Sequence, residues 1–426
     1  MTVDDVLTFV IEKPAAGGRM LARHNGRVVL VAGAIPGETV TARVERVAKG
    51  LAFAQTVDVD TASPDRRDTA IDPRCGGNVF SHIRYDRQLQ IKRDIVADAF
   101  ARIAHAPLPE LPAIVPSPEG GYRLRARFHV SHDRLGFYRE GSHQLCDAAA
   151  TGQLSQETVA WLRTAERRIQ AHGLHGIAGV ELGENIAGDE RACHLEVGAV
   201  AAENFTPLAE GLTGLSVQRA DRQGVAVAGG EPMLEDTLRP TGSDDSVLVR
   251  LRRDVRSFFQ GNRFLVQTLA RHVTSLVPGG PVVDLYAGIG LFGLSLAALG
   301  HDVTLVEGER GSGADLRRNA EPFGDRVQVA PMSVETFVAS GQLAGAARQA
   351  TVVVDPPLTG LSGDALNGII AAEPPRLIYV SCDPATLARD SRRLLDSGYS
   401  LANLTLFDMF PNTAHVEAVG VFGREH

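Results

Sequence analysis

The sequence predicts an α/β protein with three parts: a small N-terminal β-barrel, a mixed α+β central region and a C-terminal doubly wound sheet. From about residue 250 onward, short apolar strands alternate with helical stretches, a pattern typical of a parallel sheet covered by helices on both faces. Residues 1–60 instead alternate apolar and polar residues between glycine turns, which indicates short antiparallel strands. A chain of 426 residues exceeds the usual size of one domain, so we place domains at 1–60, 61–245 and 246–426.

The N-terminal part is predicted to be a barrel of about five strands joined by tight turns. Asn25-Gly26 is the clearest of these turns, because this dipeptide favours a two-residue hairpin. Barrels of this size often bind nucleic acid, although a fold alone does not establish a function. In the central part, residues 123–141 suggest a hairpin and residues 155–173 an amphipathic helix with a serine cap.

The C-terminal part contains five apolar runs that we expect to form the parallel sheet, at 281–287, 302–308, 326–331, 350–357 and 376–382. Two further runs close the chain and are joined by a loop rather than by a helix. A short loop between strands is typical of an antiparallel pair, so these two runs are expected to form an antiparallel edge.

Composition places the chain among ordinary globular proteins, with 44% hydrophobic and 22% charged residues. No stretch approaches the roughly 20 apolar residues that span a bilayer, and acidic residues stand where an export signal would carry basic ones. Four cysteines in so long a chain do not indicate a disulfide framework, and Cys146 and Cys193 are expected to be small core residues. We therefore expect a cytoplasmic protein.

The net charge of −8 argues against a generally basic nucleic-acid-binding surface. Basic residues nevertheless gather locally. The predicted central hairpin is the clearest case, with Arg123, Arg125, Arg127, Arg134 and Arg139. This group predicts either a basic groove on an acidic protein or a solvated face, and the sequence leaves both interpretations open.

A glycine turn between the first strand of the C-terminal part and the next helix indicates a nucleotide-like ligand. Gly288 and Gly290 follow Asp284 and would let the backbone approach a ligand closely. Glu307, about 23 residues after Asp284, is placed to accept hydrogen bonds from two ribose hydroxyls. The third glycine of a dinucleotide fingerprint is missing, which favours a nucleoside without phosphates, S-adenosylmethionine above all. Asp355 ends the fourth strand and would face the charged end of this cofactor.

Four stretches of the C-terminal part together resemble the RNA uracil-5-methyltransferase family, which uses S-adenosylmethionine. They lie at 258–265, 282–297, 355–361 with 379–390, and 408–422. The resemblance implies a Rossmann-like methyltransferase domain. The N-terminal barrel is similar to the TRAM domain that many members of this family carry.

The resemblance assigns catalytic roles to two residues. Cys382 would add to carbon 6 of uracil, which makes carbon 5 nucleophilic enough to accept a methyl group. Glu417 would then remove the proton from carbon 5, with His415 on the same strand face as a weaker rival base. Pro384 is expected to force a turn that holds Cys382 at the carboxyl edge of the sheet.

Cofactor contacts and partners also follow from the resemblance. It implies S-adenosylmethionine contacts at Gln260, Tyr286, Glu307 and Asp355. The partner would be ribosomal or transfer RNA, with the TRAM-like barrel favouring ribosomal RNA, and the target uridine would flip out of its stack. We expect a monomer with no membrane partner.

This chain departs from the family pattern where many members hold an iron–sulfur cluster through Cys-x5-Cys-Gly-Gly-Cys and a later cysteine. Cys75 is kept, whereas Thr69 and Asn78 fill the neighbouring positions and the fourth falls near Thr151. One thiolate cannot hold such a cluster, so we predict none. Leu358 also stands where an arginine is common.

Two other functions compete with this interpretation. An amino-group methyltransferase is suggested by Asp355-Pro356-Pro357, although Leu358 is a poor substitute for the aromatic residue that such enzymes stack on a base. An RNA-binding or RNA-folding protein with vestigial catalysis is the other, and the presence of both Cys382 and Glu417 argues against it.

Overall fold

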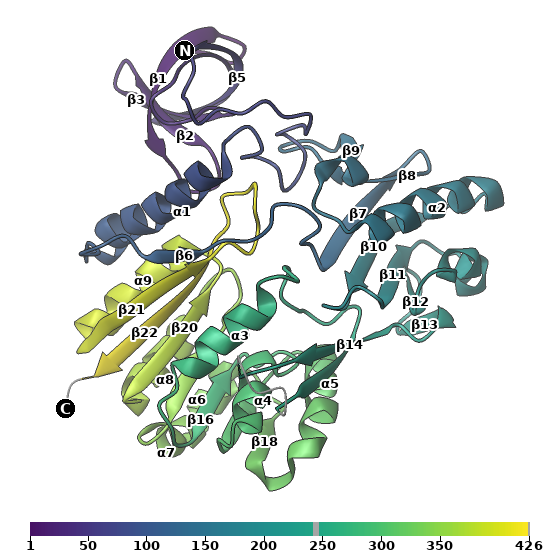
Figure 1. The fold of residues 1–426 in the computed structure, drawn as a ribbon, viewed down its shortest axis with the longest axis vertical. Coiled ribbons are helices and arrows are strands. Elements are labelled where there is room, and N and C mark those ends of the chain that lie inside the picture. The colour runs from purple at the N-terminus through teal and green to yellow at the C-terminus, as the bar shows by residue number, and fades with distance from the viewer. Residues whose placement is uncertain (242–246, 425–426) are drawn as a thin grey trace.

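The computed structural model describes residues 1–241 and 247–424. Figure 1 shows a barrel at the top, a central unit to the right and a larger C-terminal unit below. The strands form a closed barrel, a seven-stranded sheet, a two-stranded ribbon and an eight-stranded sheet. The three-part α/β architecture expected from the sequence is therefore present. Among the described residues, no helix has both the length and the apolar character needed to cross a membrane.

The N-terminal barrel has five strands in the order β1-β2-β3-β5-β4, and pairing between β1 and β4 closes it. Asn25 and Gly26 form the β2–β3 turn with positive φ angles of 48° and 78°, as the dipeptide predicts. The strands are β1 (Val6–Pro14), β2 (Met20–His24), β3 (Arg27–Ala32), β4 (Thr39–Ala48) and β5 (Leu51–Thr61).

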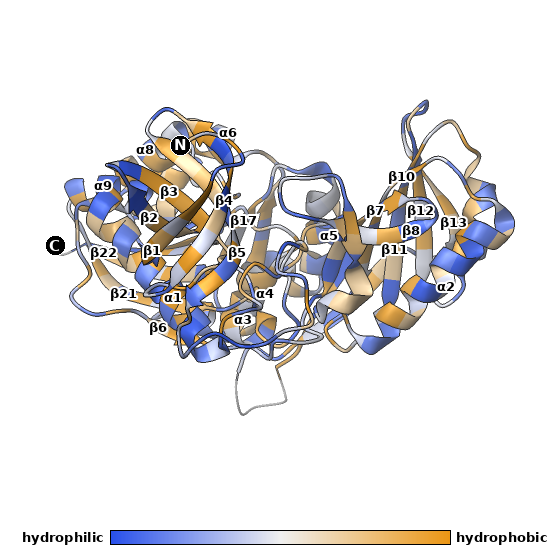
Figure 2. Ribbon diagram, turned by 90° about the horizontal axis from the view of Figure 1, so that it is seen from above, coloured by the Kyte–Doolittle hydropathy of each residue, from blue (hydrophilic) through white to orange (hydrophobic). Residues whose placement is uncertain are grey.

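The central unit is a sheet of order β13-β12-β11-β10-β7-β8-β9, covered by helix α2 (Gln156–His172). The hairpin expected around residue 132 is β7–β8, and Ser155 caps α2 by accepting a hydrogen bond from the Thr158 N–H at 3.1 Å. Figure 2 shows α2 with both hydrophilic and hydrophobic residues, as expected for a helix that buries one face. The strands are β7 (Arg125–Ser131), β8 (Arg134–Tyr138), β9 (Leu145–Asp147), β10 (Ile177–Glu184), β11 (Arg191–Val197), β12 (Gly214–Arg219) and β13 (Val225–Gly230).

The C-terminal sheet has the order β18-β17-β16-β19-β20-β22-β21-β6. Its first five strands are parallel, and β22 runs antiparallel to both β20 and β21. The strands are β16 (Val282–Leu285), β17 (Val303–Val306), β18 (Val327–Ala330), β19 (Thr351–Val354), β20 (Arg376–Ser381), β21 (Tyr399–Phe407) and β22 (Glu417–Arg424). The helices between them include α3 (Val266–Ser275), α4 (Leu291–Ala298), α5 (Arg310–Ala320), α8 (Gly363–Ala372) and α9 (Pro384–Asp396).

The edge of this sheet differs from the sequence expectation. The last two strands are antiparallel as expected, but the outermost strand is β6 (Ala113–Val115), which pairs in parallel with β21. Helix α1 (Tyr85–Ala99) lies beside β6 and α9 (Figure 1), and its residues Val96 and Ala99 join the hydrophobic core of the C-terminal sheet. A three-residue strand carries too little pattern to be recognised from sequence alone.

The proposed domain limits can be compared with this packing. The segment from α1 to β6 precedes the central sheet in the chain but packs on the C-terminal one. The predicted boundary between residues 245 and 246 lies outside the described residues. The three ranges therefore stay predictions.

The cysteines differ from the sequence interpretation. Cys75 and Cys146 form a disulfide with a Cα–Cα distance of 5.9 Å, so Cys146 is not simply a small core residue, whereas Cys193 is free and buried as expected. The Thr151 hydroxyl donates to the Ala148 carbonyl oxygen at 2.7 Å, and Cys146 rather than this position lies against Cys75. Two joined sulfurs do not fit the ligand set of a four-cysteine cluster, and the described residues contain no group of three or more metal-ligating side chains. That no cluster forms stays a prediction.

The Cys75–Cys146 disulfide predicts a redox-dependent stability. It joins Cys75, which follows the barrel in the chain, to Cys146 on β9 across a sequence separation of 71. Cys146→Ser should therefore lower the free energy of unfolding by about 2–4 kcal/mol in oxidising buffer. The same substitution should have a much smaller effect in dithiothreitol, where the wild type also loses the bond. Urea unfolding of both proteins in both buffers measures this difference. Equal stability of wild type and variant without reductant would contradict it.

Candidate active site

Three of the residues expected to bind the cofactor lie side by side at one edge of the C-terminal sheet. The last paired residues of β16, β17 and β19 are in register, with Leu285 opposite both Val306 and Val354. Tyr286, Glu307 and Asp355 each come one position later. Because parallel strands end at the same edge, the backbone register alone brings these three side chains together.

Glu307 is held against the glycine turn. Its carboxylate accepts hydrogen bonds from the Gly288 N–H at 2.8 Å and from the Glu309 N–H at 2.6 Å. Burial is the main cause that raises the pKa of Glu307 above its usual value. No heavy atom lies within 4 Å of the place where a β-carbon would stand on Gly288, so the turn leaves space for a ligand beside this carboxylate.

Asp284 supports the glycine turn through a buried hydrogen bond. It is fully buried, and its Oδ2 accepts a hydrogen bond from the Gly293 N–H at 2.8 Å, close to the start of α4. A β-carbon on Gly293 would lie 2.8 Å from this oxygen, so glycine is needed for the close approach. Burial raises the pKa of Asp284 to about 8, and its Oδ1 has no hydrogen-bond partner among the described residues.

Asp355 and Gln260 meet across two elements. The Gln260 Nε2 donates to Asp355 Oδ2 at 3.2 Å, which connects the stretch 258–265 to the end of β19. Burial raises the pKa of Asp355 to about 7, although the hydrogen bond from Gln260 acts in the opposite direction. A carboxyl group with this pKa would be stabilised in its charged form by a cationic ligand.

Cys382 and Glu417 lie at the same edge of the sheet. Strands β20 and β22 pair antiparallel, with Ser381 opposite Ala418, so Cys382 and Glu417 occupy the next opposed positions. Cys382 is half-buried, whereas Glu417 is 3% exposed. Burial, together with the negative charge of Glu417, raises the pKa of Cys382 to about 12. Burial and the neighbouring Asp355 raise the pKa of Glu417 well above its usual value.

The turn after Cys382 is the start of a helix. Asp383 is the N-cap of α9, and its Oδ1 accepts a hydrogen bond from the Thr386 N–H at 2.7 Å. Pro384 occupies the first helical position, where the missing N–H has no cost. Pro384 therefore begins the helix two residues after Cys382, and its role in holding the cysteine at the carboxyl edge stays a prediction.

The sequence interpretation placed His415 on the same strand face as Glu417, and the structure shows that this is wrong. Strand β22 begins at Glu417, and His415 is an exposed residue of the preceding loop. Its backbone N–H donates to Thr413 Oγ1 at 3.1 Å, and its ring lies edge-on to Phe410. His415 is therefore less well placed than Glu417 to reach a group bound beside Cys382.

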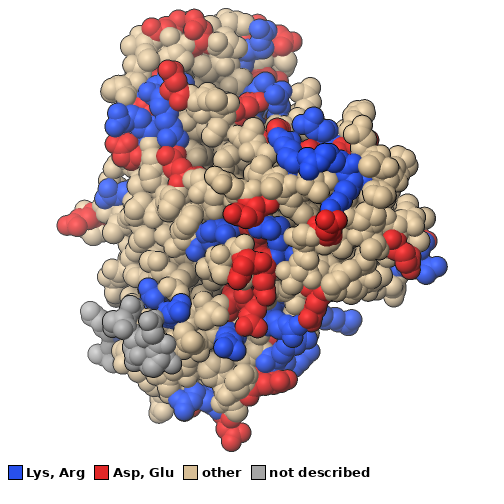
Figure 3. Space-filling model, turned by 45° about the vertical axis from the view of Figure 1, so that its right-hand side comes forward, with Lys and Arg blue, Asp and Glu red and all other residues tan. Residues whose placement is uncertain are grey.

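The arginines of the central hairpin are engaged by partners within the protein. Arg123 donates to the Arg125 carbonyl oxygen at 2.9 Å and to the Gln153 side chain. The other four form ion pairs with carboxylates: Arg125 with Glu181, Arg127 with Glu196, Arg134 with Glu166 and Arg139 with Asp72. Figure 3 likewise shows acidic side chains next to basic ones over much of one face. These pairs favour the solvated-face interpretation over a basic groove.

Two apolar residues close in sequence to Gln260 and Asp355 are exposed, and of these Phe258 was not singled out from the sequence. Phe258 is 61% exposed, two residues before Gln260, and the Arg125 guanidinium lies 6.0 Å from its ring centre. Leu358, next to the Asp355-Pro356-Pro357 turn, is 59% exposed. The sequence signal for such an exposed residue would have been a hydrophobic side chain within a polar stretch that ends at a glycine.

Comparison with known proteins gives the family. The pattern of the family described as tRNA (Uracil-5-)-methyltransferase matches residues 243–425, and that of the TRAM domain matches residues 3–57. The protein named 23S rRNA (uracil(1939)-C(5))-methyltransferase RlmD in Pseudomonas entomophila is 32% identical, over 97% of this chain and 93% of the relative. The protein of the same name in Alkalilimnicola ehrlichii is 31% identical, over 96% and 94%.

The chain belongs to the RNA uracil-5-methyltransferase family. It is thus an RNA (uracil-C5)-methyltransferase with S-adenosylmethionine as methyl donor, and its N-terminal barrel is a TRAM domain. The crystal structure of Pyrococcus abyssi tRNA (uracil-54, C5)-methyltransferase with S-adenosyl-L-homocysteine has the same fold. Its TM-score is 0.75 at 24% identity, over 97% of this chain and 99% of that one.

The residues of this uracil-5-methyltransferase fit S-adenosylmethionine. Glu307 offers two carboxylate oxygens beside the open space at Gly288, which suits two ribose hydroxyls. Asp355 offers a carboxylate that a sulfonium or ammonium group would keep charged. Tyr286 lies between these two residues. Its φ of 64° is in the left-handed region, which residues other than glycine rarely adopt.

The raised pKa of Asp355 predicts that cofactor affinity depends on pH. With a pKa of about 7 the carboxylate is mostly protonated at pH 6 and mostly charged at pH 8, so the affinity for the cationic cofactor should rise by about tenfold over this range. Isothermal titration with S-adenosylmethionine at both pH values measures the change. Asp355→Asn should bind more weakly and lose this dependence. If the affinity of Asp355→Asn rose with pH as steeply as that of the wild type, Asp355 would not be the group that binds the cationic cofactor.

Proposed function

We propose that this enzyme methylates carbon 5 of a uridine in structured RNA through a transient covalent bond between Cys382 and carbon 6 of the ring. The observation that carries the proposal is the opposed placement of Cys382 and Glu417 beyond the last register pair of β20 and β22. A nucleophile and a base on neighbouring strands can act on adjacent ring carbons, which is what this reaction requires. Gln260, Tyr286, Glu307 and Asp355 would hold the cofactor at the same edge.

The first step is the attack of Cys382. As its Sγ bonds to carbon 6, the electron pair of the ring double bond moves towards carbon 5 and the neighbouring carbonyl, and the ring becomes an enolate. The resting thiol carries its proton, because its pKa is raised to about 12. This proton passes to solvent during the attack, because the sulfur is only half-buried. Glu417, opposite the sulfur, stays available for the later step.

The later step is the removal of the proton from carbon 5. S-adenosylmethionine supplies a methyl group as an electrophilic carbon on a sulfonium, and carbon 5 then carries both this methyl group and its original proton. Glu417 accepts the proton, the electron pair re-forms the ring double bond, and the bond from Cys382 to carbon 6 breaks. Because the pKa of Glu417 is raised, its carboxyl group must have lost its own proton before it acts here.

We propose ribosomal RNA as the substrate class. The relatives named as 23S rRNA methyltransferases align with nearly the whole chain at 31–32% identity, whereas the structure named as a transfer RNA enzyme aligns at 24%. Phe258, two residues before Gln260, offers an exposed ring on which a base that has left its stack could rest.

The competing functions fit less well. An amino-group methyltransferase would need an aromatic residue after Asp355-Pro356-Pro357, and the side chain there is the exposed Leu358. An RNA-binding protein without catalysis would not need a thiol and a buried carboxyl group in opposed positions.

Substitution of the nucleophile tests the proposal. In a strain whose own copy carries Cys382→Ala, 5-methyluridine should disappear from one position of 23S rRNA, because carbon 5 is not activated. The purified variant should lose at least about a thousandfold in methyl transfer while binding S-adenosylmethionine normally. Methyluridine mapping and radiolabelled methyl transfer give the two readouts. If Cys382→Ala kept its activity, the covalent route would be excluded. If 5-methyluridine disappeared from transfer RNA instead, the substrate would be transfer RNA and not ribosomal RNA.

Substitution of the base should trap the reaction midway. Glu417→Gln keeps the size of the side chain but cannot accept the proton, so the bond to Cys382 should persist. Denaturing gel electrophoresis after incubation with RNA and cofactor should show an RNA–protein adduct that the wild type shows only briefly. The double variant Cys382→Ala/Glu417→Gln is the control and should show none. Absence of an adduct in Glu417→Gln would remove Glu417 from this role.

A further inference from the structure

The loop between β21 and β22 leads directly to the proposed base. Phe407 and Glu417 are the last register pair of the two strands, so residues 408–416 leave the sheet and return to it at Glu417. In Figure 1 this yellow loop rises from the sheet towards α1. Ala414 on the loop also packs against the hydrophobic core of the barrel. The conformation of the loop therefore decides where the chain re-enters the sheet with Glu417.

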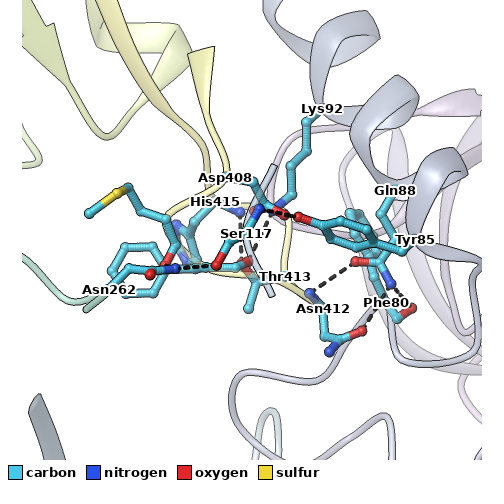
Figure 4. A network of polar contacts seen from close by, with 12 residues as sticks. Phe80, Tyr85, Gln88, Lys92, Ser117, Asn262, Asp408, Asn412, Thr413 and His415 are labelled. Carbon is cyan, nitrogen blue, oxygen red and sulfur yellow. Dashed lines mark hydrogen bonds and ion pairs between the residues drawn. The ribbon is translucent and has the colours of Figure 1, made fainter. Parts of the chain in front are cut away.

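A fully buried ion pair holds the beginning of the loop. Lys92 on α1 and Asp408 are both 0% exposed, and the Lys92 Nζ donates to Asp408 Oδ1 and, at 3.0 Å, to the Phe410 carbonyl oxygen. The Tyr85 hydroxyl donates to the other Asp408 oxygen at 2.8 Å and accepts from the Ser117 N–H at 2.7 Å. Figure 4 shows these groups pointing towards one another.

A pair of amides holds the tip of the loop from the same face of α1. Gln88 Oε1 accepts from the Asn412 N–H at 2.9 Å, and Gln88 Nε2 donates to Asn412 Oδ1 at 2.9 Å. Asn412 has a left-handed φ of 63°, which this two-way contact supports. Tyr85, Gln88 and Lys92 are spaced by three and four residues, so they lie on one face of the helix.

The cofactor side of the site touches the same loop. The Asn262 Nδ2 donates to the Met409 carbonyl oxygen at 3.1 Å and to Ser117 Oγ at 2.8 Å. A β-carbon on Gly261 would lie 2.8 Å from Phe410 Cε1, so the Phe410 ring rests directly on this backbone. Gln260, the preceding residue, binds Asp355. A continuous set of contacts therefore runs from Lys92 through the loop to both Glu417 and the cofactor end.

We propose that Lys92 and Asp408 are positioning residues for the removal of the carbon 5 proton, an inference that rests on the covalent mechanism proposed above. Cys382 lies at the end of β20 in the middle of the sheet, and its attack does not depend on the loop. Glu417 begins β22 directly after the loop, so loosening the loop should misplace the base and leave the nucleophile in place. Resolution of the adduct should therefore slow more than its formation.

Lys92→Met tests the proposal, because methionine fills the space of the lysine stem without its charge. Unmodified total RNA from a strain lacking the enzyme serves as the probe, at saturating S-adenosylmethionine. We expect the adduct on denaturing gels to decay at least about fivefold more slowly than in the wild type. Its rate of formation and the cofactor affinity should stay within about twofold. Unchanged adduct decay in a folded variant would overturn the proposal.

Two further variants separate positioning from stability. Lys92→Met/Asp408→Asn removes both charges and should recover stability without restoring adduct decay. Tyr85→Phe removes one hydrogen bond to Asp408 and should slow decay to a smaller extent. If Lys92→Met does not fold, these two variants decide, and normal adduct decay in both would overturn the proposal. Circular dichroism and urea unfolding report the stability of each.

Glu38→Gln is the matched control. Glu38 is 0% exposed and forms an ion pair with Arg66 beside the barrel, and the hydrogen bonds of both side chains go to groups outside the loop. Glu38→Gln should lower stability without prolonging the lifetime of the adduct. If the adduct persisted as long in Glu38→Gln as in Lys92→Met, the positioning role would be overturned. Glu417→Gln distinguishes a failure of this positioning proposal from a failure of the covalent mechanism. An adduct in Glu417→Gln with normal decay in the folded Lys92 variant overturns only this proposal, whereas no adduct in Glu417→Gln overturns the proposed mechanism.

Discussion

The hydrogen-bond register at the carboxyl edge of the eight-stranded sheet is the constraint on which the site depends. Tyr286, Glu307 and Asp355 each follow the last paired residue of a parallel strand, and Cys382 and Glu417 extend an antiparallel pair. The register alone places Tyr286, Glu307, Asp355 and Cys382, whereas Glu417 depends in addition on the loop that precedes it. A shift of one residue in any of these strands would turn its side chain to the opposite face.

Burial of like charges gives this edge its chemical character. Asp355 and Glu417 both have raised pKa values, and their charges help to keep the thiol of Cys382 protonated. The resting site therefore holds its protons, and its carboxyl groups become negatively charged only when these protons leave. A cationic cofactor would favour the charged forms of these carboxyl groups.

Much of this could be predicted from the sequence, because strand ends and glycine turns are local patterns. The strand order beyond the first five strands could not, since β6 is three residues long and joins the sheet from a distant part of the chain. The Cys75–Cys146 pair was missed because a spacing of 71 residues has no periodic signature. Lys92 was missed for a similar reason: a lysine on a helix reads as exposed until the partner at Asp408 is seen.

The path of the chain from α1 to β6 has a consequence for how this architecture can be divided. Strand β6 covers the outer side of β21, and Val96, Ala99, Phe100 and Ala104 fill the core beneath it. A fragment beginning near residue 246 would carry the whole reactive edge yet expose an unprotected strand and a hydrophobic hollow. The C-terminal half is therefore inseparable from the α1–β6 segment, and any transplanted version of it would have to include this segment.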